Sequence, residues 1–250
     1  MSHSSILLYD APSAAPEAWA PNIWRIRFIL NYKRLPYRTV WVEFHDVERA
    51  SRSVKAPPTS MSRDGRPVYT LPILVDPALS VSGPIVLTNP NIIAEYLETT
   101  YPARPVFPSA SRALQSVFAQ YLSDVVLKPL LVIMVPLTYA RLPPQAQAYF
   151  RGSPGMPAYM TTVPQREQAW AAVRDRFDQL ATMLDKNRGP DGDGVVAMGR
   201  ALSYADFTIC SVLVWIERVS PEDGWVRVRQ WSGGRWARLW DRCSSYMEVL

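Results

Sequence analysis

The chain has 250 residues, enough for one large domain or two packed ones, and 48% of them are hydrophobic, which excludes wholesale disorder. The net charge of +5 is scattered, and the arginines near the C-terminus alternate with Trp and Leu at helical spacing. This spacing favours a solvated helix face over a nucleic-acid-binding patch. The arginines concerned are Arg227, Arg229, Arg235, Arg238 and Arg242.

The first hundred residues alternate between strand and helix patterns. The β-rich runs are residues 5–10, 37–44 and 68–76, and the helical runs are residues 22–33 and 89–102. In the first helix we expect Arg25, Arg27 and Lys33 to face water. The inner face of the second helix is predicted to be Ile92, Ile93, Tyr96 and Leu97. This order of elements predicts an α/β domain on a small sheet over residues 1–101.

A Pro-rich stretch, "PARPVFPSASR" at residues 102–112, predicts a linker, and residues 113–250 have helical periodicity. The most apolar run, "VVLKPLLVIMVPL", is interrupted by Lys128, Pro129 and Pro136 and is shorter than a membrane span needs. Pro129 is expected to end or kink its helix, because proline lacks a backbone donor and clashes with the preceding turn. Residues 143–164 are rich in Pro, Gly and Tyr and are expected to be irregular.

Two capping-box patterns mark helix starts in this second half. Thr162 and Gln165 precede one helix, and Ser203 and Asp206 precede another, residues 203–219, which is apolar almost all round. A helix that is apolar on every face lies at the centre of a domain. We assign the Ser203/Asp206 pair a structural role and no chemistry.

Several kinds of protein are disfavoured by what the chain lacks. Its two cysteines, Cys210 and Cys243, lie in apolar periodic segments and predict buried free thiols rather than a disulfide framework. The N-terminal "MSHSSILLYD" lacks the features of a secretory signal, so we predict a cytoplasmic protein with no membrane partner. His3 and His45 are the only histidines, and neither is near a Cys, so we predict no metal site and no His-based triad.

Two stretches carry a resemblance to a known family. Residues 20–37, "APNIWRIRFILNYKRLPY", are similar to a Ser-Pro-Asn-x-Trp-Lys/Arg motif followed by "LNYKGLPY"-like residues, and residues 55–74, "KAPPTSMSRDGRPVYTLPIL", match the same group. With the linker and the buried capping-box helix, they resemble cytosolic glutathione transferases, and more closely the fungal ones related to bacterial β-etherases. The resemblance implies an α/β thioredoxin-like N-terminal domain followed by an all-α C-terminal helical bundle.

The resemblance implies a glutathione site in the first domain. In "TLPIL", Pro72 would follow Leu71 through a cis bond that turns the backbone N–H and C=O of Leu71 outward, ready to pair with a peptide-like ligand. An ordinary strand-edge proline is the alternative from the local pattern, and the surrounding context favours the cis reading.

The catalytic serine of the family falls at Ala20, which offers no hydroxyl to hold a thiolate. Asn22 matches the motif's asparagine and keeps an amide donor at the N-terminus of a helix, where the helix dipole favours an anion. Two roles stay open for Asn22 from the sequence: the catalytic donor, or a plain helix cap.

The family's acidic residue and serine, which receive the γ-glutamyl end of glutathione, are replaced by Asn89 and Pro90. Pro90 has neither a hydroxyl nor an N–H, so two hydrogen bonds to the ligand's carboxylate are lost. At about 1.5–3 kcal/mol for each bond to a charged group, the affinity loss reaches about a hundredfold or more. A shift of register by one residue, with Thr88 or Asn89 compensating, is the alternative. Glutathione is therefore predicted as a cofactor with a weakened site.

The apolar side of the predicted site is well supplied with aromatic residues. The residues expected to line a cleft between the two domains are Trp19, Trp24, Phe118, Tyr121 and Trp215. Aromatic residues at helical spacing are also the usual constituents of a core, and that alternative stays open for each of them.

The first functional hypothesis is an enzyme related to glutathione transferases that acts on a bulky hydrophobic or aromatic small molecule in secondary metabolism. The reaction is conjugation, ether cleavage, or a glutathione-independent isomerisation, dehydration or cyclisation. The second hypothesis is a non-catalytic carrier of hydrophobic small molecules, and a third is a regulatory interaction module. The resemblance also admits a homodimer.

Overall fold

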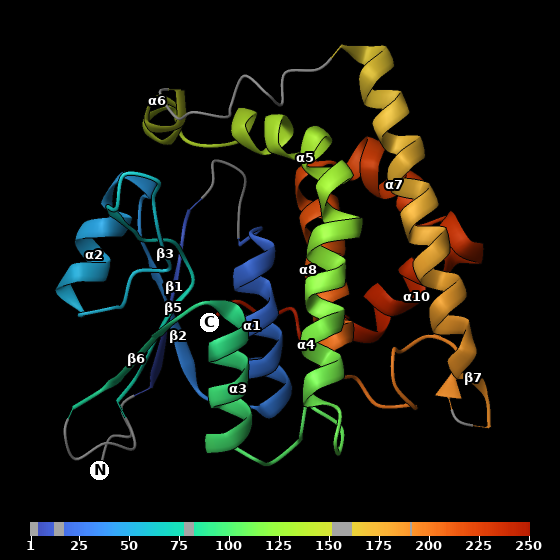
Figure 1. Cartoon of the computed structure of the whole chain (residues 1–250), viewed down its shortest axis with the longest axis horizontal. Coiled ribbons are helices and arrows are strands. Elements are labelled where there is room, and N and C mark those ends of the chain that lie inside the picture. The colour runs from blue at the N-terminus through green and yellow to red at the C-terminus, as the bar shows by residue number, and fades with distance from the viewer. Residues whose placement is uncertain (1–4, 13–17, 78–82, 152–161, 191) are drawn as a thin grey trace. The chain divides into compact units, whose positions relative to one another are not determined.

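The computed structural model describes residues 5–12, 18–77, 83–151, 162–190 and 192–250 (Figure 1). The chain divides into two compact units, and the last five residues belong with the first of them. The first unit is Met1–Arg104 with Tyr246–Leu250, and the second is Pro105–Ser245. The division falls inside the Pro-rich stretch of residues 102–112.

A four-stranded mixed sheet organises the first unit. Its strands, in spatial order, are β2 (Tyr37–Trp41), β1 (Ile6–Asp10), β5 (Ile73–Asp76) and β6 (Ile85–Thr88). β1 is parallel to β2, whereas β5 is antiparallel to both β1 and β6. Figure 1 shows helices α1 (Pro21–Lys33) and α3 (Pro90–Thr100) on one face of the sheet and α2 (Val47–Ser53) on the other. This is the thioredoxin-like arrangement, and the predicted fold class is confirmed.

Short elements of this unit were missed by the sequence patterns. Strand β6, helix α2 and the hairpin of β3 (Ser60–Met61) and β4 (Pro67–Val68) lie in stretches without a usable period. The run at residues 37–44 is a strand only to Trp41, after which a 3₁₀ turn, Phe44–Asp46, leads into α2. The run at residues 68–76 is split between β4 and β5. Elements of two to seven residues contain too few positions for a periodic pattern to appear.

The prediction that three basic residues of α1 face water is wrong. Arg25, Arg27 and Lys33 are all buried, as is nearly every residue of α1 from Ile23 to Leu30. Nη2 of Arg27 lies 2.8 Å from Oδ2 of Asp10, and Nζ of Lys33 lies 2.7 Å from Oε2 of Glu98. Periodicity assigns a charged residue to solvent by default, but a buried carboxylate on a neighbouring element reverses that assignment.

The inner face of α3 is narrower than predicted. Ile93 and Leu97 are buried, whereas Ile92 has 55% of its surface exposed. The buried residues of α3 are Ile93, Ala94, Leu97 and Glu98, so the buried face begins one position after Ile92. The prediction for Ile92 is therefore wrong.

The main-chain carbonyls of the C-terminal segment accept hydrogen bonds from α1 and β2. Nδ2 of Asn31 donates to the carbonyls of Tyr246 at 2.7 Å and Glu248 at 2.8 Å. The N–H of Thr39 in β2 donates to the carbonyl of Leu250 at 2.7 Å. The segment therefore occupies the free edge of β2, and Figure 1 places the C-terminus beside this strand.

The second unit is helical, as predicted. Its helices are α4 (Arg112–Tyr121), α5 (Lys128–Ala140), α6 (Pro144–Arg151), α7 (Val163–Leu184), α8 (Tyr204–Val219), the short α9 (Val226–Val228) and α10 (Trp231–Ser244). π-helical segments span Leu122–Leu127 and Pro221–Trp225, and a small hairpin joins β7 (Arg188–Gly189) to β8 (Gly192–Asp193). α6 lies in the stretch expected to be irregular. The rest of that stretch up to residue 161 is outside the described residues.

Helix α8 lies at the centre of this unit, as its sequence predicts. Every residue from Tyr204 to Ile216 is buried, and α8 packs against α4, α5 and α10. Both predicted capping boxes are present, at Thr162 with Gln165 before α7 and at Ser203 with Asp206 before α8. Cys210 in α8 and Cys243 in α10 are buried free thiols, as predicted.

Pro129 does not end its helix. Residues 112–140 form one helical stretch of 29 residues, in which the π segment Leu122–Leu127 immediately precedes Pro129, and Figure 1 shows α5 turning away from the direction of α4. The kink is therefore confirmed. By length and composition alone, the 29-residue helix that contains this apolar run could cross a membrane. Leu130, Ile133 and Met134 are buried within the second unit.

The arginines near the C-terminus are largely paired with carboxylates. Arg227 lies 2.8 Å from Glu167, and Arg242 lies 2.8 Å from Asp193. Arg235, which was expected on a solvated helix face, is buried and lies 2.8 Å from Oδ1 of Asp185. That expectation is therefore wrong for Arg235.

Candidate functional site

The strand registers bring three loops of the first unit to one edge of the sheet. Ile73, the first residue of β5, pairs with Thr88, the last residue of β6, and also with Tyr9 near the end of β1. The segments that continue from these strand ends are therefore neighbours. They are the segment before β5, which contains Leu71 and Pro72, the start of α3, and residues 11 and 12 directly after β1.

The peptide bond between Leu71 and Pro72 is cis, as predicted. Pro72 is buried, Leu71 is half-buried, and β5 begins one residue later. Within the described residues, neither the N–H nor the C=O of Leu71 has a hydrogen-bond partner. Backbone groups in such positions are normally paired, so Leu71 presents one donor and one acceptor to an incoming chain.

Helix α1 begins without a side-chain cap. Ala20 is its N-cap residue, in extended conformation, and Pro21 occupies the first helical position. The first-turn N–H groups of Ile23 and Trp24 both donate to the carbonyl of Ala20 at 3.0 Å. Ala20 thus supplies a carbonyl and no hydroxyl at this end of the helix.

Asn22 is exposed in the first turn of α1, and its side chain is oriented by a neighbour. Its Oδ1 accepts a hydrogen bond of 2.7 Å from Nη2 of the buried Arg25. Its Nδ2 makes no hydrogen bond to any described residue, so the amide donor is available at a helix N-terminus. Arg25 was not predicted as part of the site, although its spacing of three residues from Asn22 is a usable signal on a helix. Arg25 is a positioning residue for this amide.

Asn89 connects β6 to α3 in an unusual backbone conformation. Its φ of 71° and ψ of 119° lie where residues other than glycine are rare, and its Oδ1 accepts from the N–H of Asn91 at 2.9 Å. Such strain clusters at functional sites. Pro90 occupies the first position of α3, and the hydroxyl of Thr88 donates to the carbonyl of Pro57 at 3.2 Å. The donor of Thr88 is thus already engaged.

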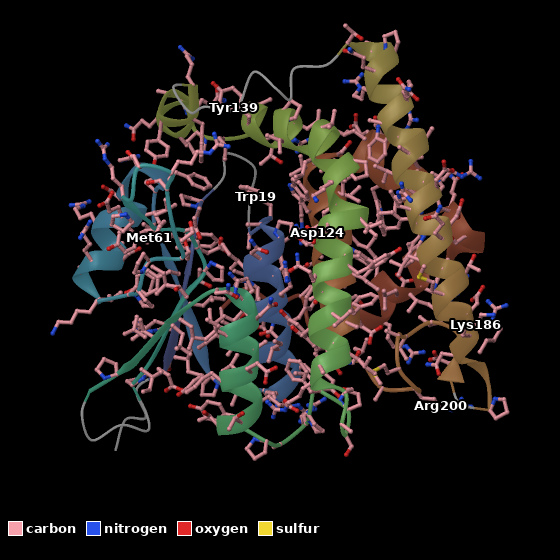
Figure 2. The ribbon with its side chains drawn as sticks, in the orientation of Figure 1. Trp19, Met61, Asp124, Tyr139, Lys186 and Arg200 are labelled. Atoms are coloured by element: carbon pink, nitrogen blue, oxygen red, sulfur yellow. The ribbon has the colours of Figure 1, made fainter. Side chains whose placement is uncertain are left out.

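The two tryptophans near the start of α1 differ in their surroundings. Trp19 is half-buried, lies just before α1 (Figure 2), and has its ring centroid 6.4 Å from that of Phe44. Its buried Nε1 has no partner among the described residues. Trp24 is fully buried against Phe28, and its Nε1 donates to the carbonyl of Ala18 at 2.7 Å.

The aromatic residues named in the second unit also divide into two kinds. Phe118 and Tyr121 are half-buried in the last two turns of α4, directly before the π segment Leu122–Leu127. Trp215 is buried in α8, and its Nε1 donates to Oγ1 of Thr138 at 2.9 Å. Among the described residues, no three His, Cys, Asp or Glu side chains are grouped so that they could hold a metal ion.

A thioredoxin-like unit followed by a helical unit defines the class of two-domain proteins to which this chain belongs. Residues 19–105 match the N-terminal domain of glutathione S-transferases, and residues 113–246 match their C-terminal domain. The chain belongs to the glutathione S-transferase family.

Fungal relatives match nearly the whole chain. The glutathione S-transferase-like protein ustS of Aspergillus flavus is 27% identical over 259 residues, which cover 98% of this chain and 92% of the relative. A glutathione S-transferase of Ceriporiopsis subvermispora, solved in complex with glutathione, is 33% identical over 99% of both chains with a TM-score of 0.89. Glutathione transferase GSTFuA3 of Phanerochaete chrysosporium is 32% identical over 100% of both chains with a TM-score of 0.90. The resemblance to fungal glutathione transferases is confirmed.

Proposed function

We propose that the chain is a glutathione transferase-like enzyme of secondary metabolism that acts on a bulky hydrophobic or aromatic small molecule. Glutathione is its cofactor, held in a weakened site by Leu71, Pro72 and Asn89, and Asn22 is its catalytic donor. The reaction is conjugation, ether cleavage, or a rearrangement or dehydration in which glutathione takes no part. We place it in the cytoplasm. A homodimer is supported by Leu114 and Val117, which lie one turn apart on α4 and are each 67% exposed.

The observation that carries this proposal is the unpaired backbone of Leu71. Its N–H and C=O lack partners among the described residues, at the sheet edge where α3 also begins. A tripeptide thiol supplies an N–H and a C=O at the spacing of a strand, so it can pair with Leu71 as an added strand does. The relative from Ceriporiopsis subvermispora, which binds glutathione, supports this assignment.

Asn22 is assigned as the donor to the cofactor's sulfur. A thiolate is the reactive form of a thiol, and a hydrogen bond to sulfur stabilises it. The amide of Asn22 is oriented by Arg25, keeps Nδ2 available, and lies at a helix N-terminus whose dipole favours the same negative charge. One oriented donor therefore replaces the missing hydroxyl at Ala20.

The apolar substrate is assigned to Trp19 in the first unit and to Phe118 and Tyr121 in the second. All three are half-buried, so each has surface to offer to a ligand. The free Nε1 of Trp19 adds a donor for a hydroxylated substrate. π segments are frequent at functional sites, and one follows Tyr121 directly. Trp24 and Trp215 are buried with their N–H groups engaged, and we assign them to the framework that supports these residues.

A non-catalytic carrier of hydrophobic molecules is the second candidate, favoured by the absence of a hydroxyl at Ala20. Thermal unfolding of the whole chain with glutathione and with a panel of hydroxylated aromatic compounds separates the two functions. A ligand that binds only the folded state raises the unfolding midpoint. The enzyme proposal expects a rise with glutathione as well as with aromatic compounds. A rise with aromatic compounds alone, together with no turnover of any of them, supports the carrier, and no rise with either contradicts both.

The variant Ala20→Ser is expected to increase the turnover of a generic aromatic electrophile with glutathione by about tenfold. A serine hydroxyl adds one hydrogen bond to the thiolate, and a bond to a charged group contributes about 1.5–3 kcal/mol. The same hydroxyl also caps α1, which has no side-chain cap, and should add about 1 kcal/mol to the free energy of unfolding.

The matched control for Ala20→Ser is Ala20→Gly, which changes the cap residue without adding a hydroxyl. Steady-state kinetics and urea unfolding are measured on both variants. A gain in stability with unchanged turnover would show that the added hydroxyl lies away from the sulfur, and the assignment of this helix start to the reacting end of glutathione would be wrong.

A further inference from the structure

The first unit contains a cavity that none of the residues assigned above lines. Its volume is about 380 Å³, and it lies between the end of β2, the 3₁₀ turn Phe44–Asp46 and helix α2. Its lining residues are Trp41, Val42, Glu43, Asp46, Arg49, Ala50 and Ser53. We refer to it as the Trp41 cavity. Pockets that hold small molecules begin at about 300 Å³, so its size suits a compact ligand.

One carboxylate of the Trp41 cavity, that of the half-buried Glu43, has an oxygen without a partner among the described residues. Oε2 of Glu43 is buried and has no hydrogen-bond partner in the described part of the chain. The other carboxylate of the lining, Asp46, is already paired with Arg49 at 2.8 Å, and Nε2 of His45 lies 3.8 Å from the same carboxylate oxygen. The charges of Asp46 and Arg49 cancel, so the carboxylate of Glu43 gives the cavity lining a net negative charge. A buried carboxylate oxygen without a partner is unfavourable, and a ligand that donates to it removes that cost.

An aromatic ring lies on the same side of the backbone as this carboxylate. Trp41 ends β2 and Glu43 is also extended, with φ −62° and ψ 144°, so the two side chains point to the same face, two residues apart. Val42 between them points into the core, where it is buried. Trp41 keeps 45% of its surface exposed, so part of its ring is available to a ligand. The face of an indole ring attracts a cation, and its edges and face also accept apolar contact.

We propose that the Trp41 cavity binds a small amine, with a primary ammonium group on Glu43 and an apolar or aromatic body against Trp41. The carboxylate selects a cation that can donate hydrogen bonds, and the indole selects the apolar body to which the cation is attached. A neutral alcohol of the same shape satisfies the second requirement and not the first. This site is separate from the proposed glutathione and substrate residues, and its ligand is additional to theirs.

Isothermal titration of the whole chain with 2-phenylethylamine, and with 2-phenylethanol as its neutral counterpart, tests the proposal. We expect the amine to bind at one site per chain, at least tenfold more tightly than the alcohol, because a hydrogen bond to a charged group is worth that factor. Glu43→Gln, which keeps the shape of the side chain, should weaken the amine at least tenfold and leave the alcohol unchanged. Trp41→Leu should weaken both.

The control variant is Glu48→Gln, which removes a carboxylate of α2 that pairs with Arg52 on the surface and does not line the cavity. Its affinity for the amine should equal that of the unmodified chain. The proposal is overturned if the amine does not bind, if the alcohol binds equally well, or if Glu48→Gln weakens the amine as much as Glu43→Gln does. Circular dichroism of Glu43→Gln should show a thermal midpoint at or above that of the unmodified chain, because an unpaired buried charge has been removed. A large fall in the midpoint would show that Glu43 is structural, and would also overturn the proposal.

Discussion

Replacing Asp206 by alanine is expected to lower the free energy of unfolding of the helical unit by about 3–5 kcal/mol. Asp206 is fully buried at the start of α8, and its two oxygens accept three hydrogen bonds. Oδ2 accepts from the N–H of Ser203 at 2.8 Å and from its hydroxyl at 2.7 Å, and Oδ1 accepts from the N–H of Ala197 at 2.7 Å. The variant leaves buried donors without a partner at the helix on which the unit is built. Urea unfolding followed by far-UV circular dichroism measures the change.

The matched control is Gln165→Ala, which removes the equivalent residue from the capping box at Thr162. That box lies at the exposed start of α7, where water can take over the freed donors. We expect a loss of about 1 kcal/mol or less there. Equal losses in the two variants would show that burial adds nothing to the role of Asp206, contrary to the expectation.

The same carboxyl group should give the stability a characteristic dependence on pH. Burial raises the pKa of Asp206 to about 6, against the opposing effect of its hydrogen bonds. Because the folded-state pKa lies above the unfolded value of about 3.9, the folded state binds the extra proton between these two values. The contribution of the group to stability is therefore fully present below pH 4 and is lost as the pH rises through about 6. In the difference between the unmodified chain and Asp206→Ala, this loss should amount to ~2–3 kcal/mol, and a difference that grows with pH would contradict it.

The helical unit was the part of the fold most accessible from the sequence, because α8 is specified by a local pattern. Its cap, its apolar character on every face and its central position all follow from consecutive residues. Helix α1 shows the opposite case. Its arginines look solvent-exposed by periodicity, yet Arg27 is buried because Asp10, seventeen residues away, supplies the opposite charge. Pairing between distant residues leaves no periodic trace, and neither do short elements such as α2 and β6.

Some features of the candidate site could likewise be predicted from the sequence, and others could not. The positions of Ala20 and Asn89 at helix starts follow from short local motifs, in which a proline occupies the first helical position. The cis bond at Leu71–Pro72 was predicted only from the wider context of the family resemblance, because the local pattern also fits an ordinary strand-edge proline. The hydrogen bond between Arg25 and Asn22 was missed, because Arg25 was assigned to solvent by its place in the helical period. The Trp41 cavity could not be predicted, since it depends on how the end of β2 packs against α2 and on a carboxylate that finds no partner.

Restoring the family's pair of polar residues at the start of α3 should tighten glutathione binding by about a hundredfold or more. The double variant Asn89→Asp, Pro90→Ser supplies a carboxylate for the amino group of the γ-glutamyl end, and a hydroxyl and an N–H for its carboxylate. Each bond to a charged group contributes about 1.5–3 kcal/mol, and two of them account for the expected factor. Both residues suit the backbone, because Asp has nearly the same shape as the Asn that already adopts this conformation, and serine is compatible with the first turn of a helix.

Calorimetric titration with glutathione measures the effect, and two partial variants separate its sources. Pro90→Ala restores the N–H without the hydroxyl, so it should recover only part of the gain. Asn89→Asp alone should act on the amino group while Pro90 still blocks the carboxylate. β6 ends at Thr88, and Asn89 is the N-cap residue of α3. The double variant therefore tests whether Asn89 and Pro90 are the positions that correspond to the family's acidic residue and serine. If the double variant folds normally and binds glutathione no more tightly than the unmodified chain, Asn89 and Pro90 do not receive the γ-glutamyl end. The strain at Asn89 would then serve the junction between β6 and α3 and not the ligand.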